Sequence, residues 1–171
     1  TFSIVATGTY QWQVSTAAVP TFTNIGGATS ASYTVTGAAA GLNGNQYRCV
    51  VSSQCGSTNS NPALLTVNAA PVVVTNPQSV TLCAGSNNTF TVAAGGSGLT
   101  YQWQVSTTAV PAFTDIPTAN SASYILTGIT AGMNGNQYRC VVTGSCTPSA
   151  TSAAALLTVV TSVTLTSQPV N

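Results

Sequence analysis

An internal repeat constrains this chain more than any other feature. The segment YQWQVST at residues 10–16 recurs at 101–107, and the match continues without a gap for 42 positions, of which 31 are identical. TFSIVATG at 1–8 also matches TFTVAAGG at 89–96. The offsets of 91 and 88 residues exceed the period of solenoid repeats and are close to the length of one small β-sandwich. Each repeat is therefore predicted to be a domain in its own right.

The pattern within each repeat is typical of β-strands. Hydrophobic and polar residues alternate, β-branched and aromatic residues are frequent, and no stretch shows the apolar stripe of an amphipathic helix. Turn sequences such as AGSN, GGSG, MNGN and TGSC separate the alternating segments. In the second repeat the predicted strands are residues 79–83, 89–94, 100–106, 112–116, 122–127, 137–143 and 153–160. This many short strands with such spacing predict an all-β fold made of two packed sheets.

Residues on the third and sixth predicted strands resemble the immunoglobulin-fold signature. Trp103 lies on the third strand, and Tyr138 stands two residues before Cys140 on the sixth. The matching residues of the first repeat are Trp12, Tyr47 and Cys49. The resemblance implies that the tryptophans pack in the core and that the tyrosines form the tyrosine corner of that family.

The phrases CAGSNNTFTV, YQWQVST, SASY and NGNQYRCVV also resemble immunoglobulin-like repeats in large secreted and surface proteins of environmental bacteria. That resemblance implies an extracellular location and a place in a stalk, an adhesin or a fibre. The sequence departs from antibody-type domains where Val92, and Ile4 in the first repeat, occupy the position of the partner cysteine. We therefore expect the usual cross-sheet disulfide to be missing.

The repeat divides the chain into three parts: a first repeat at 1–68, a second at 69–160, and a tail at 161–171. Residues 71–88 have no counterpart before Thr1, so the first sandwich is expected to lack its first strand. The tail, TSVTLTSQPVN, resembles PVVVTNPQSV at the opening of the second repeat. The tail is therefore expected to be a spare first strand.

Two interpretations of these ends are open. The chain is either a window cut from a longer array, or a subunit whose tail completes the open sandwich of the next subunit by β-strand addition. An incomplete sandwich exposes an unpaired sheet edge, which proteins cover. In either case domains would stack end to end, with short linkers such as residues 67–77 between them.

Charge is almost absent from the sequence. There are two basic residues, one acidic residue and no histidine among 171 residues, while 44% are hydrophobic. No basic patch can neutralise a run of phosphates, so nucleic acid is not an expected partner. No apolar run approaches the roughly 20 residues that span a bilayer, so membrane insertion is not expected either. A near-neutral surface gives little repulsion between copies, which favours self-association.

The same composition argues against an enzyme. Asp115 is the only acidic residue, and its counterpart in the first repeat is Asn24. Without histidine or lysine the chain has no base for a catalytic triad, and one carboxylate cannot form a general acid–base pair or a calcium cage. We predict a non-enzymatic protein that needs no cofactor.

Five cysteines are present: Cys49, Cys55, Cys83, Cys140 and Cys146. Without histidine or a CxxC pair a zinc site is not expected, and disulfides in an oxidising, exported setting are the better interpretation. In one arrangement a Cys83-type residue bonds a Cys146-type residue of a neighbouring domain. In the other, local bonds join Cys49 to Cys55 and Cys140 to Cys146. The cross-domain bond is the preferred prediction.

Two further groups of residues are candidates for contacts. Arg48 and Arg139 are repeated next to core cysteines and face away from them, so they are candidates for a subunit or domain contact. Aromatic residues that could hold a sugar are Phe22, Tyr33, Phe113 and Tyr124.

Taken together, these features predict a structural repeat of an extracellular bacterial surface fibre or adhesin stalk that assembles head to tail. The competing function is a carbohydrate-binding adhesive module of a secreted protein.

Overall fold

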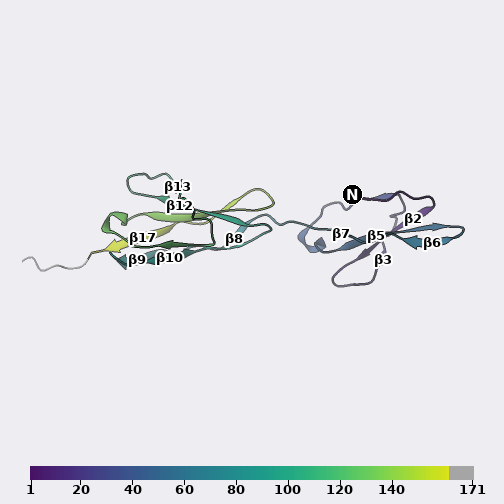
Figure 1. The fold of residues 1–171 in the computed structure, drawn as a ribbon, viewed down its shortest axis with the longest axis horizontal. Helices are drawn as coiled ribbons and strands as arrows, with labels where there is room; N and C mark the ends of the chain where they lie inside the picture. The colour runs from purple at the N-terminus through teal and green to yellow at the C-terminus, as the bar shows by residue number, and fades with distance from the viewer. Residues whose placement is uncertain (162–171) are drawn as a thin grey trace, which may run out of the picture. The chain divides into compact units, whose positions relative to one another are not determined.

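The computed structural model of the chain describes residues 1–161. It contains two compact units, Thr1–Asn68 and a second unit that begins at Ala69 (Figure 1). Apart from two single 3-10 turns, Ala40–Leu42 and Ala131–Met133, the regular structure of the described residues consists of strands. The predicted all-β, two-domain immunoglobulin-like fold is confirmed. Residues 162–171, which are ten of the eleven residues of the predicted spare strand, lie outside the described residues.

The second unit is a sandwich of two strand layers. Its strands are β8 (Val72–Thr75), β9 (Val80–Cys83), β10 (Asn88–Thr91), β11 (Ala93–Gly95), β12 (Thr100–Ser106), β13 (Thr114–Asp115), β14 (Ser123–Leu126), β15 (Gln137–Thr143), β16 (Ala150–Thr151) and β17 (Ala155–Val160). One layer has the order β13-β12-β15-β17-β9, with β16 also paired to β15. The other layer consists of the pairs β10-β14 and β8-β11. All pairs are antiparallel except β9 with β17, which run parallel.

The core of the second unit follows from the alternation of side chains along β15. Tyr138, Cys140 and Val142 are buried, whereas the residues between them are not. Trp103 lies opposite Cys140 in the register of β12 and is completely buried. The Phe90 ring of the opposite layer stacks on Tyr138, with the ring centroids 4.8 Å apart. One sheet alone cannot bury this face, so the apolar alternation requires the second layer.

The indole of each tryptophan keeps a hydrogen bond inside the core. Trp103 Nε1 donates to the Ser121 carbonyl at 2.9 Å, and Trp12 Nε1 donates to the Ser30 carbonyl at 3.0 Å. Because a buried N–H without a partner is costly, this bond allows a large aromatic ring to sit in each core.

The first unit repeats this plan with fewer strands. Its strands are β1 (Phe2–Ser3), β2 (Thr9–Ser15), β3 (Thr23–Asn24), β4 (Ser32–Tyr33), β5 (Gln46–Ser53), β6 (Gly56–Asn59) and β7 (Ala63–Leu64). One layer has the order β3-β2-β5-β6, with β7 also paired to β5, and the other consists of β1 and β4. Within residues 1–161, the first unit has no counterpart of β8 and β9.

The smaller strand set leaves the first core less covered. Its buried apolar side chains are Trp12, Tyr47, Cys49 and Val51. Phe2, the counterpart of the buried Phe90, is only partly buried. The difference follows from the missing strands, because the sequences of the two cores are nearly the same.

The structure also corrects some of the sequence-based boundaries. Residues 67–77 were expected to act as a linker, but Val72–Thr75 forms β8, which pairs with β11 in the second unit. The strand expected at 112–116 is reduced to Thr114–Asp115. These differences arise because strand pairing, which is a tertiary property, decides where a short apolar segment becomes a strand.

Candidate assembly interface

The strands β8 and β9 and the turn between them cover one edge of the second unit. The Ala153 N–H donates to Asn76 Oδ1 at 2.8 Å, and the Leu156 N–H donates to Ser79 Oγ at 2.9 Å. Pro77, between these two anchors, is buried. Along this edge the partners are always 77 residues apart, from Asn76 opposite Ala153 to Cys83 opposite Val160 in β17. The segment 76–83 therefore lies in one continuous parallel register along 153–160.

Corresponding positions in the first unit can be fixed by a shared hydrogen bond. Ser60 Oγ accepts from the Cys49 N–H at 2.9 Å, and Ser152 Oγ accepts from the Cys140 N–H at the same distance. Ser60 therefore corresponds to Ser152. It follows that residues 61–67 correspond to 153–159, the segment that β9 and the preceding turn cover in the second unit.

In the first unit this segment is uncovered, and we call it the open edge (residues 61–67). Ala63 is exposed, whereas Ala155 at the same position is completely buried. Leu64 is 62% exposed. A cavity of about 160 Å³ opens beside the edge, and its lining includes Phe2, Ile4, Trp12, Tyr47, Asn61 and Ala63. The cavity therefore reaches the first core, where it touches Trp12, although that side chain stays buried.

The backbone of the open edge also presents hydrogen-bonding groups. The Leu65 N–H donates to the Asn45 carbonyl at 2.8 Å, and the Val67 N–H donates to Asn43 Oδ1 at 2.8 Å. These two groups face the residues just before β5, so by strand alternation the N–H groups of Leu64 and Thr66 face the other way. The equivalent of the Leu64 N–H in the second unit is the one that Ser79 accepts. An edge of this kind is a template for another strand.

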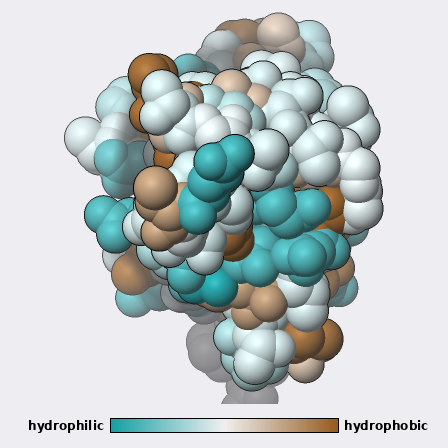
Figure 2. Space-filling model, turned by 90° about the vertical axis from the view of Figure 1, so that its right-hand side faces the viewer, coloured by the Kyte–Doolittle hydropathy of each residue, from teal (hydrophilic) through white to brown (hydrophobic). Residues whose placement is uncertain are grey.

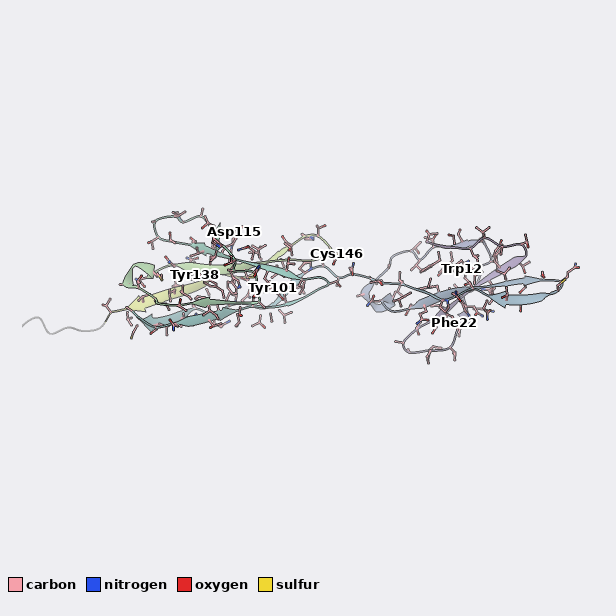
Figure 3. All side chains as sticks on the ribbon, in the orientation of Figure 1. Trp12, Phe22, Tyr101, Asp115, Tyr138 and Cys146 are labelled. Carbon is pink, nitrogen blue, oxygen red and sulfur yellow. The ribbon has the colours of Figure 1, made fainter. Side chains whose placement is uncertain are left out.

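Arg48 and Arg139 lie on the outer face of each sheet, opposite the core cysteines. The guanidinium carbon of Arg48 is 4.1 Å from the centroid of the Phe22 ring. Arg48 Nε also donates to Gln13 Oε1 at 2.7 Å, and Gln13 Nε2 donates to Asn24 Oδ1 at 2.8 Å. Figure 3 shows Trp12 and Phe22 on opposite sides of the sheet that carries β2 and β5.

The second unit contains the same chain of contacts, with an acidic residue at its end. Arg139 lies 3.9 Å from the centroid of Phe113 and donates to Gln104 Oε1 at 2.8 Å. Gln104 Nε2 donates to Asp115 Oδ1 at 2.8 Å. The sequence reasoning missed this network, although Gln, Phe and Arg recur at the same offset of 91 residues. The network uses each arginine within its own unit, and a contact to another subunit stays a prediction.

The aromatic candidates for sugar binding fall into two groups. Arg48 and Arg139 lie over the rings of Phe22 and Phe113, so the arginines occupy a ring face on which a sugar would stack. Tyr33 and Tyr124 pack against the core, and each also lines a surface cavity, of about 200 Å³ and 240 Å³ respectively. The remaining walls of both cavities are mainly serine, threonine, alanine and glycine or asparagine. The structure thus offers a small polar cavity beside a tyrosine in each unit.

The cysteines occupy two kinds of environment. Cys49 and Cys140 are completely buried, whereas Cys55 and Cys83 are exposed, and all four are thiols. Neither of the two local disulfides is therefore formed. Cys146 lies beyond the end of β15 (Figure 3).

A Cys83–Cys146 bond within one unit is excluded by geometry. Cys83 lies opposite Val160, and Cys146 follows the opposite end of the sheet, at Thr143. About ten residues of strand, or roughly 30 Å, separate the end of the sheet near Cys83 from the end near Cys146. A disulfide needs Cα atoms within about 7 Å. A bond of this type can only join different units.

Burial changes the acidity of several core groups in the second unit. Burial raises the pKa of the Cys140 thiol, and a backbone hydrogen bond offsets part of that rise. Burial also raises the pKa of the Tyr138 hydroxyl, with the Asn136 side chain acting in the opposite direction. The pKa of Tyr124 is raised by burial and by its neighbour Tyr138. The tyrosine-corner role of Tyr47 and Tyr138 stays a prediction.

Residues 1–161 contain no group of three His, Cys, Asp or Glu side chains that could hold a metal ion. No helix in that described range is long and apolar enough to cross a membrane.

Comparison with solved structures shows the fold. The structure of DIP-gamma IG1+IG2 matches with a TM-score of 0.57 and 13% identity, covering 88% of this chain and 83% of that one. Dpr2 Ig1-Ig2 in complex with DIP-Theta Ig1-Ig3 matches with a TM-score of 0.54 and 14% identity, covering 88% and 56%. The N-terminal eight Ig domains of Down Syndrome Cell Adhesion Molecule match with a TM-score of 0.51 and 16% identity, covering 67% and 15%. At these identities the likeness concerns the fold alone.

Among curated proteins, none matches this chain. A family model described as a domain of unknown function (DUF8696) matches twice, over residues 1–69 and 72–161. The two matches follow the repeat and together cover nearly the whole chain. The chain therefore belongs to the DUF8696 family. Each of the two matched regions folds as an immunoglobulin-like sandwich.

Proposed function

We propose that this chain is a structural, non-enzymatic segment of an extracellular bacterial fibre or adhesin stalk, and that it assembles head to tail. In this assembly the open edge of the first unit is covered by a strand from a neighbouring copy. The observation that carries the proposal is that the chain repeats one immunoglobulin-like sandwich and has almost no charged side chains. In the described residues, the edge at 61–67 of the first unit is exposed beside a cavity, and an exposed edge can pair with another strand.

The surface chemistry supports this function. With three charged side chains in 171 residues, copies have almost no electrostatic barrier to association. The face shown in Figure 2 is largely of intermediate hydropathy, with a group of hydrophilic residues near its centre and hydrophobic residues scattered over it. Contacts between copies would therefore depend on backbone pairing and apolar packing. The similar structure of Down Syndrome Cell Adhesion Molecule, an adhesion molecule with consecutive Ig domains, supports this proposal.

Electron microscopy of the purified chain tests the proposal. We expect filaments whose length increases with protein concentration, and we expect them to disappear when residues 162–171 are deleted. A variant with Ala18→Ser, in an exposed loop, serves as a control that should assemble normally. Monodisperse single chains at high concentration, measured by light scattering, would contradict head-to-tail assembly.

The exposed cysteines extend this proposal to a cross-domain disulfide. Cys83 ends β9, and Cys55 lies at the turn between β5 and β6, in the region that corresponds to the Cys146 turn. In a head-to-tail fibre exposed to oxygen, Cys83 of one copy would bond Cys55 of the next. Non-reducing electrophoresis of assembled material should show a ladder of covalent multimers that Cys83→Ser abolishes. Monomers alone would contradict the bond but leave non-covalent assembly intact.

The second candidate function is carbohydrate binding, and it depends on the polar cavities beside Tyr33 and Tyr124. Both recur at the same place in each unit, and the second contains the Asn120 side chain. Glycan-array binding by the chain, weakened by Asn120→Ala, would favour this alternative. An array without signal would leave the structural function as the better account.

A further inference from the structure

The outer face of each sheet carries a row of three polar side chains, and the two rows differ in charge. In the first unit the row lies across β5, β2 and β3 and consists of Arg48, Gln13 and Asn24. In the second unit it lies across β15, β12 and β13 and consists of Arg139, Gln104 and Asp115. We call them the first and the second polar row. Asp115 is the only acidic residue of the sequence, so residues 1–68 contain no carboxylate side chain that could neutralise Arg48.

Hydrogen bonds fix the direction of each row. Arg48 Nε can only donate, so Gln13 turns its Oε1 towards Arg48 and its Nε2 towards Asn24. Asn24 accepts through Oδ1, which leaves its Nδ2 with two N–H groups for other partners. The first polar row therefore ends in hydrogen-bond donors on both sides. In the second polar row the carboxylate of Asp115 accepts from Gln104 and has no N–H to offer, so this row ends in a negatively charged acceptor.

The guanidinium of Arg48 is held in place before any ligand binds. It lies over the Phe22 ring, 4.1 Å from the ring centroid, and its Nε donates to Gln13. Within residues 1–161 its terminal Nη groups have no hydrogen-bond partner. A guanidinium that is already oriented loses little conformational entropy when it binds a ligand. The parallel N–H groups of its two Nη atoms match the two oxygens of a carboxylate.

We propose that the first polar row is a binding site for a sugar acid. The carboxylate of the sugar pairs with the Nη groups of Arg48, and one of its hydroxyl oxygens accepts from Asn24 Nδ2. The backbones of β5 and β3 are two strand spacings apart, about 10 Å, so a ligand that contacts both ends must be larger than a carboxylate alone. In the second polar row Asp115 repels the same carboxylate, so that row does not bind it. This site is separate from the open edge and from the cavities beside Tyr33 and Tyr124, so it goes beyond the proposed function.

Nuclear magnetic resonance in solution tests the site directly. The sequence has two arginines, so an isotope-labelled chain gives two arginine Nε–H signals, which an Arg48→Gln variant assigns. The chain is titrated with sodium glucuronate at about pH 6.5, where the sugar carboxylate is ionised. We expect a saturable shift of the Arg48 signal and no such shift of the Arg139 signal. Glucose, which lacks the carboxylate, and sodium chloride at the same ionic strength are the controls, and neither should reproduce the shift.

The exchange of one residue between the two rows provides matched variants. Asn24→Asp gives the first polar row the charged end of the second and should weaken glucuronate binding at Arg48 by about fivefold or more. Asp115→Asn gives the second polar row the donor end of the first, and the Arg139 signal should then respond to glucuronate. Both variants keep an oxygen that accepts from the neighbouring glutamine, as the other unit shows, so the fold should be retained. The backbone amide spectrum checks this.

Three results would overturn the proposal: equal responses of the two arginine signals, an unchanged affinity of Asn24→Asp, or no response of Arg139 in Asp115→Asn. A second copy of the chain also offers a carboxylate, that of Asp115. A shift of the Arg48 signal that depends on chain concentration without sugar, and that Asp115→Asn removes, would identify this carboxylate as the occupant and overturn the sugar acid. Filament formation is measured separately, so failure of this site would leave the assembly function standing.

Discussion

The guanidinium carbon of Arg139 lies 3.9 Å from the ring centroid of Phe113, and Arg48 lies 4.1 Å from Phe22 in the other unit. Each arginine also holds a glutamine of the neighbouring strand. The only two basic side chains of the sequence therefore have the same structural task twice. Each arginine packs on the outer face of its sheet against the phenylalanine of a neighbouring loop.

Replacement of the phenylalanine should weaken this arginine–aromatic contact. We expect Phe113→Leu to destabilise the second unit by about 1 kcal/mol, because the cation–π contact is lost while most of the apolar volume stays. Chemical unfolding followed by hydrogen exchange, which resolves the two units, measures the change. Phe22→Leu should have a similar effect confined to the first unit. No change in either unit would mean that the arginine–aromatic contact contributes nothing to stability.

The anchors of the covering strand should also matter for stability. Ser79→Ala removes the acceptor of the Leu156 N–H and should cost about 1 kcal/mol in the second unit. The exposed Thr81 on β9 provides the matched control, because Thr81→Ala also removes a hydroxyl from this segment. Urea unfolding measures both variants. Equal stability of the two variants would show that the Ser79 hydrogen bond is not an anchor.

Alkaline pH should destabilise the second unit. Burial raises the pKa of Cys140 above its ordinary value of 9.0, and those of Tyr124 and Tyr138 above 10.0. The unfolded chain therefore releases these protons at lower pH than the folded unit does, so stability is fully present below about pH 9 and falls as the pH rises further. Thermal unfolding at pH 7.5 and 10.5 measures the loss. Tyr124→Phe should reduce the loss, whereas a constant unfolding temperature would contradict the mechanism.

The cysteines should differ sharply in their reactivity. Alkylation of the folded chain at pH 8 should modify Cys55 and Cys83, which are exposed, and spare Cys49 and Cys140, which are fully buried. The raised pKa of Cys140 further lowers its thiolate fraction. Peptide mass spectrometry reports each site separately. Modification of Cys140 at the rate of Cys83 would contradict the buried position, and unfolding in urea should make all four accessible.

Much of the candidate site could be anticipated from the sequence. The absence of a counterpart of residues 71–88 within the given first repeat, and the likeness of the tail to PVVVTNPQSV, are both visible in the sequence alone. The cavity could not be anticipated in this way. It depends on which residues of β1, β2 and β5 approach the open edge, and sequence adjacency does not contain that information.

The sequence by itself determined the domain period, the all-β class and the alternation that buries Trp103 and Cys140, because a repeat and a two-residue periodicity are local properties of the chain. Only the tertiary structure decided that Val72–Thr75 is a strand, that Phe22 lies under Arg48, and that residues 61–67 are uncovered. Strand pairing, ring stacking and edge exposure join residues far apart in the chain. Their free energies depend on a partner's position in space, which no local pattern records.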